Sequence, residues 1–339
     1  MKKSIRELRR ILDKDTYGGM FLDEDQKKVH LNVVDTTNVD LLDAYDDVAI
    51  HKVRYSISEL NHVKEDLVQH MRELNIQSVG IDEKNNVVHV DMYKPTKDAI
   101  AKLKSFVNDD KCLNIEETFE ELSLQNNSDT MDYSDIISRT DTTIKMAPGS
   151  RIYVENRGYC TVSANVRWGN GSSRKYGFLT CGHGIYPEDK VYYNDQYIGK
   201  IEDATCNSDY DCGIIEQASP YIYVNGPARN GIMFSYVGGY PENGEDVWFS
   251  GGVSASLTGK CTINNVTAVV GNIEMNGLIR TNCPTQAGDS GGMLFIKNDN
   301  DEYTFTAALV GGNSVNMSYF RPYMTTRNYY ADMYGYFSV

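Results

Sequence analysis

One segment of the sequence places a serine between glycines: Ala287-Gly288-Asp289-Ser290-Gly291-Gly292. Glycines on both sides allow the backbone to turn tightly and leave the serine side chain exposed. The same turn can direct the backbone amides of Gly288 and Ser290 to one side, as the stabilisation of an oxyanion requires. Because a serine hydroxyl is a weak nucleophile, this chemistry also needs a base within hydrogen-bond reach.

The candidate base is His183, the single histidine among residues 146–339. A neutral imidazole can take the proton of Ser290 and later return it to a leaving group. The imidazole in turn needs a buried carboxylate that fixes its tautomer. Asp211 precedes an apolar run that predicts a strand, so it is the candidate for this role, and Asp209 is the alternative.

The three candidate residues lie in a part of the chain, residues 146–339, whose sequence pattern predicts an all-β domain. Short aromatic and β-branched runs follow one another along residues 146–339, separated by turns that contain glycine, asparagine and proline. Many short strands at such spacing indicate a barrel or a sandwich. The absence of a repeat of 20–50 residues in the sequence argues against a propeller. The expected strands are Arg151–Glu155, Thr161–Trp168, Tyr176–Thr180, Val191–Ile198, Gly213–Glu216, Asp246–Ser250, Asn265–Val270, Leu278–Thr281, Met293–Lys297 and Phe305–Val310.

The composition changes near residue 145, which predicts two differently built domains. Residues 1–145 hold three of the 28 glycines and five of the six histidines, whereas both tryptophans lie in residues 146–339. We expect an amino-terminal region over residues 1–121 and the all-β domain over residues 146–339. The acidic, Asn/Ser/Thr-rich stretch 122–145 is typical of a surface linker.

The amino-terminal region is expected to be α+β. Apolar residues recur at steps of three and four along residues 57–74, as one face of a helix does. Two strands, Gln77–Ile81 and Val87–Met92, flank a polar turn, and Pro95 can begin a second helix. The five histidines of this region lack cysteine partners at ligand spacing, so neither a metal site nor a cofactor is expected.

Charge and hydropathy limit the partners of the chain. The 47 acidic residues outnumber the 33 basic ones, for a formal net charge of −14. Nucleic acid is therefore not expected as a partner, because binding it needs clustered cations. No apolar run reaches the roughly 18 residues of a membrane span. The basic start of the chain leads into no apolar stretch, so no signal peptide is expected in this sequence.

Three segments resemble a known family in their content and order. The segments "FLTCGHG", "SDYDCGII" and "QAGDSGGMLF" are similar to those of the chymotrypsin-like serine peptidases, most closely the bacterial streptogrisin and alpha-lytic branch. The resemblance covers about residues 146–339. It implies two antiparallel β-barrels and a serine endopeptidase that acts through an acyl-enzyme. In this family His183 would be the general base, Asp211 its orienting carboxylate and Ser290 the nucleophile.

The same resemblance implies further roles. The amides of Gly288 and Ser290 would form the oxyanion hole, and the strand Val310, Gly311 and Gly312 would pair with the substrate backbone. The expected partners are protein or peptide substrates and the chain's own amino-terminal region, since this branch carries a pro-domain before the protease. The mature amino terminus of relatives falls near Lys145-Met146, which predicts cleavage of a zymogen there.

The seven cysteines divide unevenly between the two regions. Cys112 lies alone in the first, and six cysteines lie in the part expected to mature. An even number is typical of a disulfide-bonded, secreted protein. The pairing of the relatives is altered here, because Gly184 stands where they carry a cysteine directly after the histidine. Cys181 is the candidate replacement as the partner of Cys160.

A second class of function stays open at this point. A protease-like fold can serve as a binding module that cleaves nothing. The presence of all three candidate groups, His183, Asp211 and Ser290, argues against this alternative, because a binding module does not need them.

Overall fold

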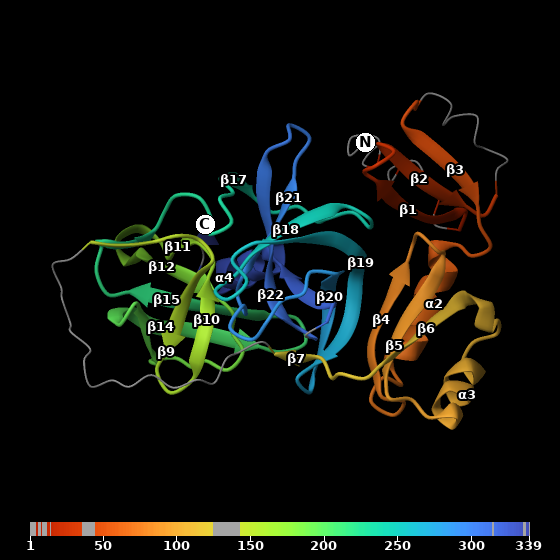
Figure 1. The fold of residues 1–339 in the computed structure, drawn as a ribbon, viewed down its shortest axis with the longest axis horizontal. Helices are drawn as coiled ribbons and strands as arrows, with labels where there is room; N and C mark the ends of the chain where they lie inside the picture. Colours follow the sequence, from red (N-terminus) through yellow and green to blue (C-terminus); the bar gives the residue numbers. More distant parts are fainter. Residues whose placement is uncertain are drawn as a thin grey trace. The chain divides into compact units, whose positions relative to one another are not determined.

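The computed structural model describes residues 15–35, 45–124, 143–313, 315–334 and 337–338, together with residues 5, 8, 12 and 13. The chain forms two compact units (Figure 1). Unit 1 consists of Met1–Glu121, Pro241–Asp246 and Lys260–Thr281, and unit 2 consists of Leu122–Tyr240, Val247–Gly259 and Asn282–Val339. Two segments from the carboxy-terminal half of the sequence therefore group with the amino-terminal residues.

Unit 1 begins with a small three-stranded sheet. Its strands, in spatial order, are β1 (Tyr17–Asp23), β2 (Lys28–Val33) and β3 (Val48–Lys52). The first pair is antiparallel and the second pair is parallel. Buried Met20, Val29 and Leu31 form its core with Ile5 and Leu8.

A second sheet of unit 1 combines segments that are distant in sequence. The hairpin of β4 and β5 extends on one side to β6, which runs parallel to β5, and on the other side to β19. Thr267 and Ala268 of β19 pair with Val79 and Ser78 of β4, and β19 pairs in turn with β20. The strands are β4 (Ile76–Asp82), β5 (Val87–Tyr93), β6 (Leu113–Thr118), β19 (Leu257–Val270) and β20 (Ile273–Thr281).

Two helices contribute to the core of this sheet, α2 (Ile57–Val68) and α3 (Lys97–Ser105), and Asp110–Cys112 form one 3₁₀ turn. Ser56 and Glu59 start α2 with a capping box, in which each side chain accepts a hydrogen bond from the backbone N–H of the other. Leu60 and Leu67 of α2 are buried in the shared core. The expected α+β architecture of the amino-terminal region is confirmed.

Unit 2 contains an antiparallel sheet of eight strands in the order β10-β9-β13-β14-β15-β12-β11-β24. A 3₁₀ turn, Gly171–Ser173, separates β11 from β12. The strands are β9 (Ser150–Val154), β10 (Gly158–Val162), β11 (Asn165–Trp168), β12 (Lys175–Thr180), β13 (Lys190–Tyr193), β14 (Gln196–Cys206), β15 (Asp211–Gln217) and β24 (Phe337–Ser338).

A second group of strands in unit 2 is centred on β22. This strand pairs antiparallel with β21, β23 and the short β7, and parallel with β17; β21 pairs with β18, and β8 pairs parallel with β16. Their bounds, with the final helix, are β7 (Ser123–Leu124), β8 (Ile144–Met146), β16 (Ile222–Val224), β17 (Phe234–Val237), β18 (Asp246–Ser250), β21 (Met293–Lys297), β22 (Tyr303–Gly312), β23 (Ser318–Pro322) and α4 (Tyr323–Tyr334).

One apolar core joins the two sheets of unit 2. Trp168 and Leu179 of the first sheet pack in the same cluster as Phe295 and Phe305 of the second, with Tyr330 of α4. The expected all-β architecture of the carboxy-terminal part is confirmed. Within the described ranges, no helix has the length and apolar character needed to cross a membrane. The predicted linker 122–145 lies mostly outside the described residues.

Candidate active site

Three side chains of unit 2 form one hydrogen-bonded series. The imidazole Nε2 of His183 lies 2.7 Å from Ser290 Oγ, and its Nδ1 lies 2.7 Å from Asp211 Oδ2. His183 follows β12, Asp211 begins β15, and Ser290 precedes β21. All three residues are at most 2% exposed. The series has the geometry in which a serine hydroxyl can pass its proton to an imidazole that a carboxylate orients.

The carboxylate of Asp211 is held in place by the backbone. Its Oδ1 accepts hydrogen bonds from the amides of Gly182 at 2.9 Å and of His183 at 2.8 Å. A Cβ atom at Gly182 would lie 1.9 Å from the carbonyl oxygen of Thr205, so only glycine fits this approach. Asp209, the alternative from the sequence, is exposed. Of the two aspartates, it is therefore Asp211 that contacts His183.

The serine lies in a tight turn that needs glycine. Gly288 has a φ of +96° and Gly291 a φ of +83°, in the region that L side chains rarely adopt. A Cβ atom at Gly291 would lie 2.6 Å from the carbonyl oxygen of Thr161. The carbonyl of Ser290 accepts from the amide of Thr161 at 2.8 Å. These contacts explain the glycines that flank the serine in the sequence.

A buried carboxylate also fixes the turn before the serine. Oδ1 of Asp289 accepts hydrogen bonds from the amides of Val253 and Ser254, both at 2.8 Å. Oδ2 accepts from the amide of Gln286 at 2.9 Å. Asp289 therefore holds the loop before Ser290 in place through three backbone amides.

The strand expected to bind the substrate backbone, residues 310–312, is already paired with another segment of the chain. Val310, Gly311 and Gly312 lie at the end of β22 and are buried. In unit 2 the chain's own β7 runs antiparallel to this end, with Leu124 opposite Gly311 and Ser123 opposite Gly312. Backbone pairing of this kind is how an extended peptide adds to a sheet edge.

Two residues near Asp211 were not singled out from the sequence. Cys206 lies opposite Asp211 in the β14–β15 pair. Arg321 of β23 is 2% exposed and donates a hydrogen bond to the carbonyl of Ser208 at 3.2 Å. Burial lowers the pKa of the Arg321 guanidinium, while the charge of Asp211 opposes this shift. An arginine within the otherwise apolar "SYFRP" segment is the signal that could have indicated a buried charge.

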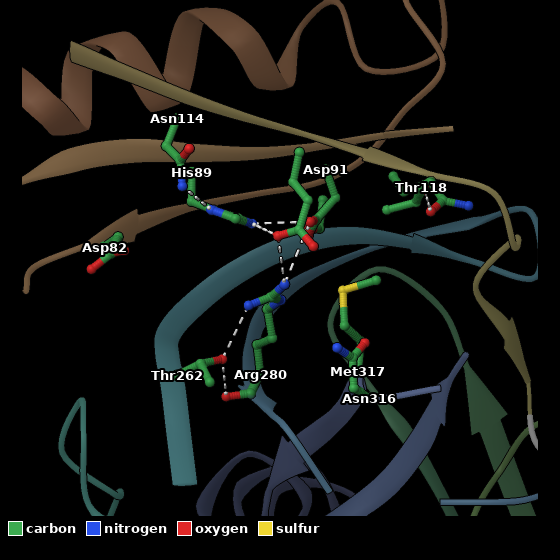
Figure 2. Close-up of polar contacts among 12 residues, drawn as sticks. Asp82, His89, Asp91, Asn114, Thr118, Thr262, Arg280, Asn316 and Met317 are labelled. Carbon is green, nitrogen blue, oxygen red and sulfur yellow. Dashed lines mark hydrogen bonds and ion pairs between the residues drawn. The ribbon is translucent and has the colours of Figure 1, made fainter. Parts of the chain in front are cut away.

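A second cluster of charged side chains lies in unit 1 (Figure 2). His89 Nε2 lies 2.9 Å from Asp91 Oδ1 and 3.5 Å from a carboxylate oxygen of Glu116. These three groups are close enough to share an ion. The guanidinium of Arg280, however, lies 3.4 Å from Asp91 and 3.8 Å from Glu116. This positive charge balances the carboxylates and disfavours a metal ion at the same place.

The fold and this series of side chains resemble those of the chymotrypsin-like serine peptidases, and one comparison supports the resemblance. No family model matches the chain. Over 161 residues the chain is 29% identical to Serine protease 2 of Streptomyces fradiae, a match that covers 44% of this chain and 87% of that protein. The resemblance inferred from the three motifs is thus confirmed.

Solved structures that are similar to the chain include two bacterial proteases. Protease A of Thermobifida fusca aligns with a TM-score of 0.46 and 22% identity, over 55% of this chain and 96% of that one. Nocardiopsis protease aligns with a TM-score of 0.46 and 18% identity, over 55% of this chain and 96% of that one.

Proposed function

We propose that the chain is a serine endopeptidase that hydrolyses peptide bonds in protein or peptide substrates. The observation that carries this proposal is the series from Ser290 Oγ through the imidazole of His183 to Asp211, with 2.7 Å at each step. The similarity to a curated serine protease supports the same class of chemistry.

In the proposed reaction, His183 takes the proton of Ser290 as its oxygen attacks the scissile carbonyl. The amides of Gly288 and Ser290 would stabilise the oxyanion; losing one donor of this kind typically costs about 2.7–4 kcal/mol. His183 then gives the proton to the leaving amine, and an acyl-enzyme remains on Ser290. A water molecule, deprotonated by the same imidazole, releases the acid product. Asp211 stabilises the imidazolium in both steps.

We propose the end of β22 as the strand that pairs with substrate. The pairing of Ser123 and Leu124 with Gly312 and Gly311 supports this role, because a segment of extended chain already uses these backbone groups. In this proposal β7 precedes the segment that the enzyme cleaves, and it restricts access of other peptides until it leaves. The chain would then be a zymogen with residues 1–121 as its pro-region.

We propose that the protein is secreted and that its disulfides form after export. All seven cysteines, each of them in the described part of the chain, are thiols in the structure. The buried thiols of Cys160 and Cys181 are hydrogen-bonded to each other, which supports them as one pair able to oxidise. Mass spectrometry of the exported protein, with and without a reductant before alkylation, tests this pairing.

The test of the proposed function is labelling by a fluorophosphonate probe, which reacts with an activated serine. We expect labelling at Ser290 in the chain after its own processing, and its loss in Ser290→Ala and His183→Ala. Asp211→Asn should lower the labelling rate strongly, by about 10⁴ in the best-studied enzyme of this kind. Asp209→Asn is the matched control and should label as wild type does. Absence of labelling in wild type, with binding of peptides but no cleavage, would favour the binding-module alternative.

A further inference from the structure

Arg229 of unit 2 binds the loop of residues 251–254, which follows β18. Its Nη1 donates hydrogen bonds to the backbone carbonyl of Gly251, at 2.8 Å, and to that of Gly252. The backbone of the arginine is held as well, because its amide donates to the carbonyl of Pro148 at 3.0 Å. A guanidinium presents its N–H donors on a rigid plane, so one nitrogen can bind two carbonyls at once. The side chain thus fixes the orientation of two consecutive peptide groups.

Each of these two peptide groups also donates toward the turn of Ser290. In a trans peptide the C=O and the N–H point in opposite directions, so a carbonyl bound to Arg229 directs the amide of the same group away from the arginine. The amide of the first group is that of Gly252, which donates to Thr161 Oγ1 at 2.8 Å. Thr161 Oγ1 donates in turn to the carbonyl of Gly288 at 3.0 Å. The first peptide group is therefore linked to the glycine that lies two residues before the serine.

The second peptide group is linked to the carboxylate next to the serine. It joins the carbonyl of Gly252 to the amide of Val253, which donates to Asp289 Oδ1 at 2.8 Å. The amide of Ser254 donates to the same oxygen at 2.8 Å. A Cβ atom at Gly251 would lie 2.5 Å from Asp289 Oδ1, so the loop approaches the carboxylate too closely for a side chain there. The loop that Arg229 binds therefore packs directly against Asp289.

We propose that Arg229 is a positioning residue for the oxyanion hole. The proposed donors of that hole are the amides of Gly288 and Ser290, which flank Asp289 in the sequence. The two hydrogen-bonded routes from Arg229 end on the carbonyl of Gly288 and on the carboxylate of Asp289. Without the guanidinium, the two loop carbonyls can turn toward water and take their amides out of these contacts. This inference rests on the proposed function, because the position of the donors matters only if Ser290 attacks a carbonyl.

The experiment measures the kinetics of fluorophosphonate labelling at Ser290 in Arg229→Met, in the full chain after its own processing. We expect kinact to fall about 10- to 100-fold with KI unchanged, because displaced donors stabilise the developing oxyanion less well. Arg229 is exposed, so the substitution leaves no buried cavity and the variant should fold. Arg229→Lys keeps a cationic donor and should recover part of kinact. Arg157→Met removes another exposed arginine of unit 2, whose partner is the carboxylate of Asp189, and should label as wild type does.

A spectroscopic readout separates an effect on the oxyanion hole from general damage to the fold. The proton on His183 Nδ1, which reports the contact with Asp211, should keep its NMR chemical shift in Arg229→Met, because neither route passes through these two residues. A wild-type chain that is not labelled would overturn the proposed function and this inference with it. If wild type is labelled, three results would each overturn the role of Arg229 alone: an Arg229→Met rate equal to wild type, a shifted Nδ1 proton in that variant, or an Arg229→Lys rate as low as that of Arg229→Met.

Discussion

The guanidinium of Arg280 contacts the carboxylate of Asp91 inside unit 1, with Nη2 3.4 Å from Oδ1, although 189 residues separate them in sequence. Asp91 is fully buried and also accepts hydrogen bonds from Ser78 and His89. Arg280 lies on β20, so this ion pair joins the β19–β20 hairpin to β5. A segment of the protease-like half of the chain is thereby bound to the amino-terminal region by charge as well as by strand pairing.

Removing this arginine should destabilise unit 1. In Arg280→Met the carboxylate of Asp91 stays buried without its cation, and breaking a buried pair in this way costs about 3–5 kcal/mol. Chemical denaturation followed by fluorescence measures the loss in the free energy of unfolding. Arg157→Met is the control, because the Arg157–Asp189 pair is exposed and such pairs contribute about 0–1 kcal/mol. Equal losses in the two variants would contradict the prediction.

The stability of the chain should fall in acid partly through Asp91. Burial raises the pKa of this carboxyl, but the hydrogen bond from His89, the charge of Arg280 and the hydrogen bond from Ser78 outweigh it and hold the pKa below the usual 3.8. A lowered carboxyl pKa contributes stability above pH 3.8 that is lost as the pH falls through the folded-state value. Denaturation measured from about pH 5 down to about pH 2 should show a shallower decline in Asp91→Asn. If the free energy of unfolding falls with pH as steeply in Asp91→Asn as in wild type, the prediction is contradicted.

Lys64 predicts a further rise in stability with pH on the alkaline side. This lysine on α2 donates to the carbonyl of Asn265 in the hairpin, and burial lowers its pKa from 10.5 to about 8. Between these values the unfolded chain binds the proton more strongly, so stability rises with pH from about 8 to 10.5. The rise is on the order of 3 kcal/mol. Lys64→Met should remove it, and persistence of the full rise in that variant would assign it to other groups.

The glycine after the serine should not tolerate a side chain. At Gly291 an added Cβ meets the Thr161 carbonyl at 2.6 Å and the Cys181 amide at 2.8 Å, at a φ of +83°. Gly291→Ala should therefore displace the turn, abolish labelling of Ser290 and lower Tm. Gly171→Ala is the matched control, because Gly171 has a φ of +54° with open space around it and loses only about 1–2 kcal/mol. Normal labelling in Gly291→Ala would refute the steric argument.

Self-processing should begin shortly after Leu124. Ser123 and Leu124 already pair with the proposed substrate strand, so the first bond presented to Ser290 is expected a few residues further along. The bond that the family resemblance indicates, Lys145-Met146, lies inside β8, where Met146 is buried. Intact mass and amino-terminal sequencing of the active chain identify the cut, and Ser290→Ala should stay whole. A first product that begins at Met146 would argue for the other bond.

The sequence predicted those features that depend on local patterns. The glycines around Ser290 and the single histidine of residues 146–339, His183, identified two side chains that lie in hydrogen-bond contact. Alternating and helical periodicities identified the α+β and all-β parts. The glycine turn and the periodicities are each contained in a few neighbouring residues, whereas His183 was singled out because residues 146–339 hold no other histidine.

Features that depend on pairing between distant segments were not predicted. Nothing in "GLIRT" distinguishes Arg280 from a solvent-exposed arginine, because its partner Asp91 lies on another strand far back in the sequence. The grouping of residues 260–281 with β4 was not predicted for the same reason, because the register between strands that are remote in sequence leaves no local pattern. The pairing of Cys206 with Asp211 depends on the register between β14 and β15. The four residues 207–210 that connect these strands do not by themselves define that register.

The pairing of β19 with β4 has a consequence for the order of events during synthesis. The ribosome makes β4, β5 and β6 long before it makes the hairpin that extends their sheet. At a typical elongation rate of about 5–20 residues per second, these strands wait on the order of ten seconds or more with the edge of β4 unpaired. An unpaired strand edge is a template for aggregation, so the nascent chain carries this risk throughout the interval.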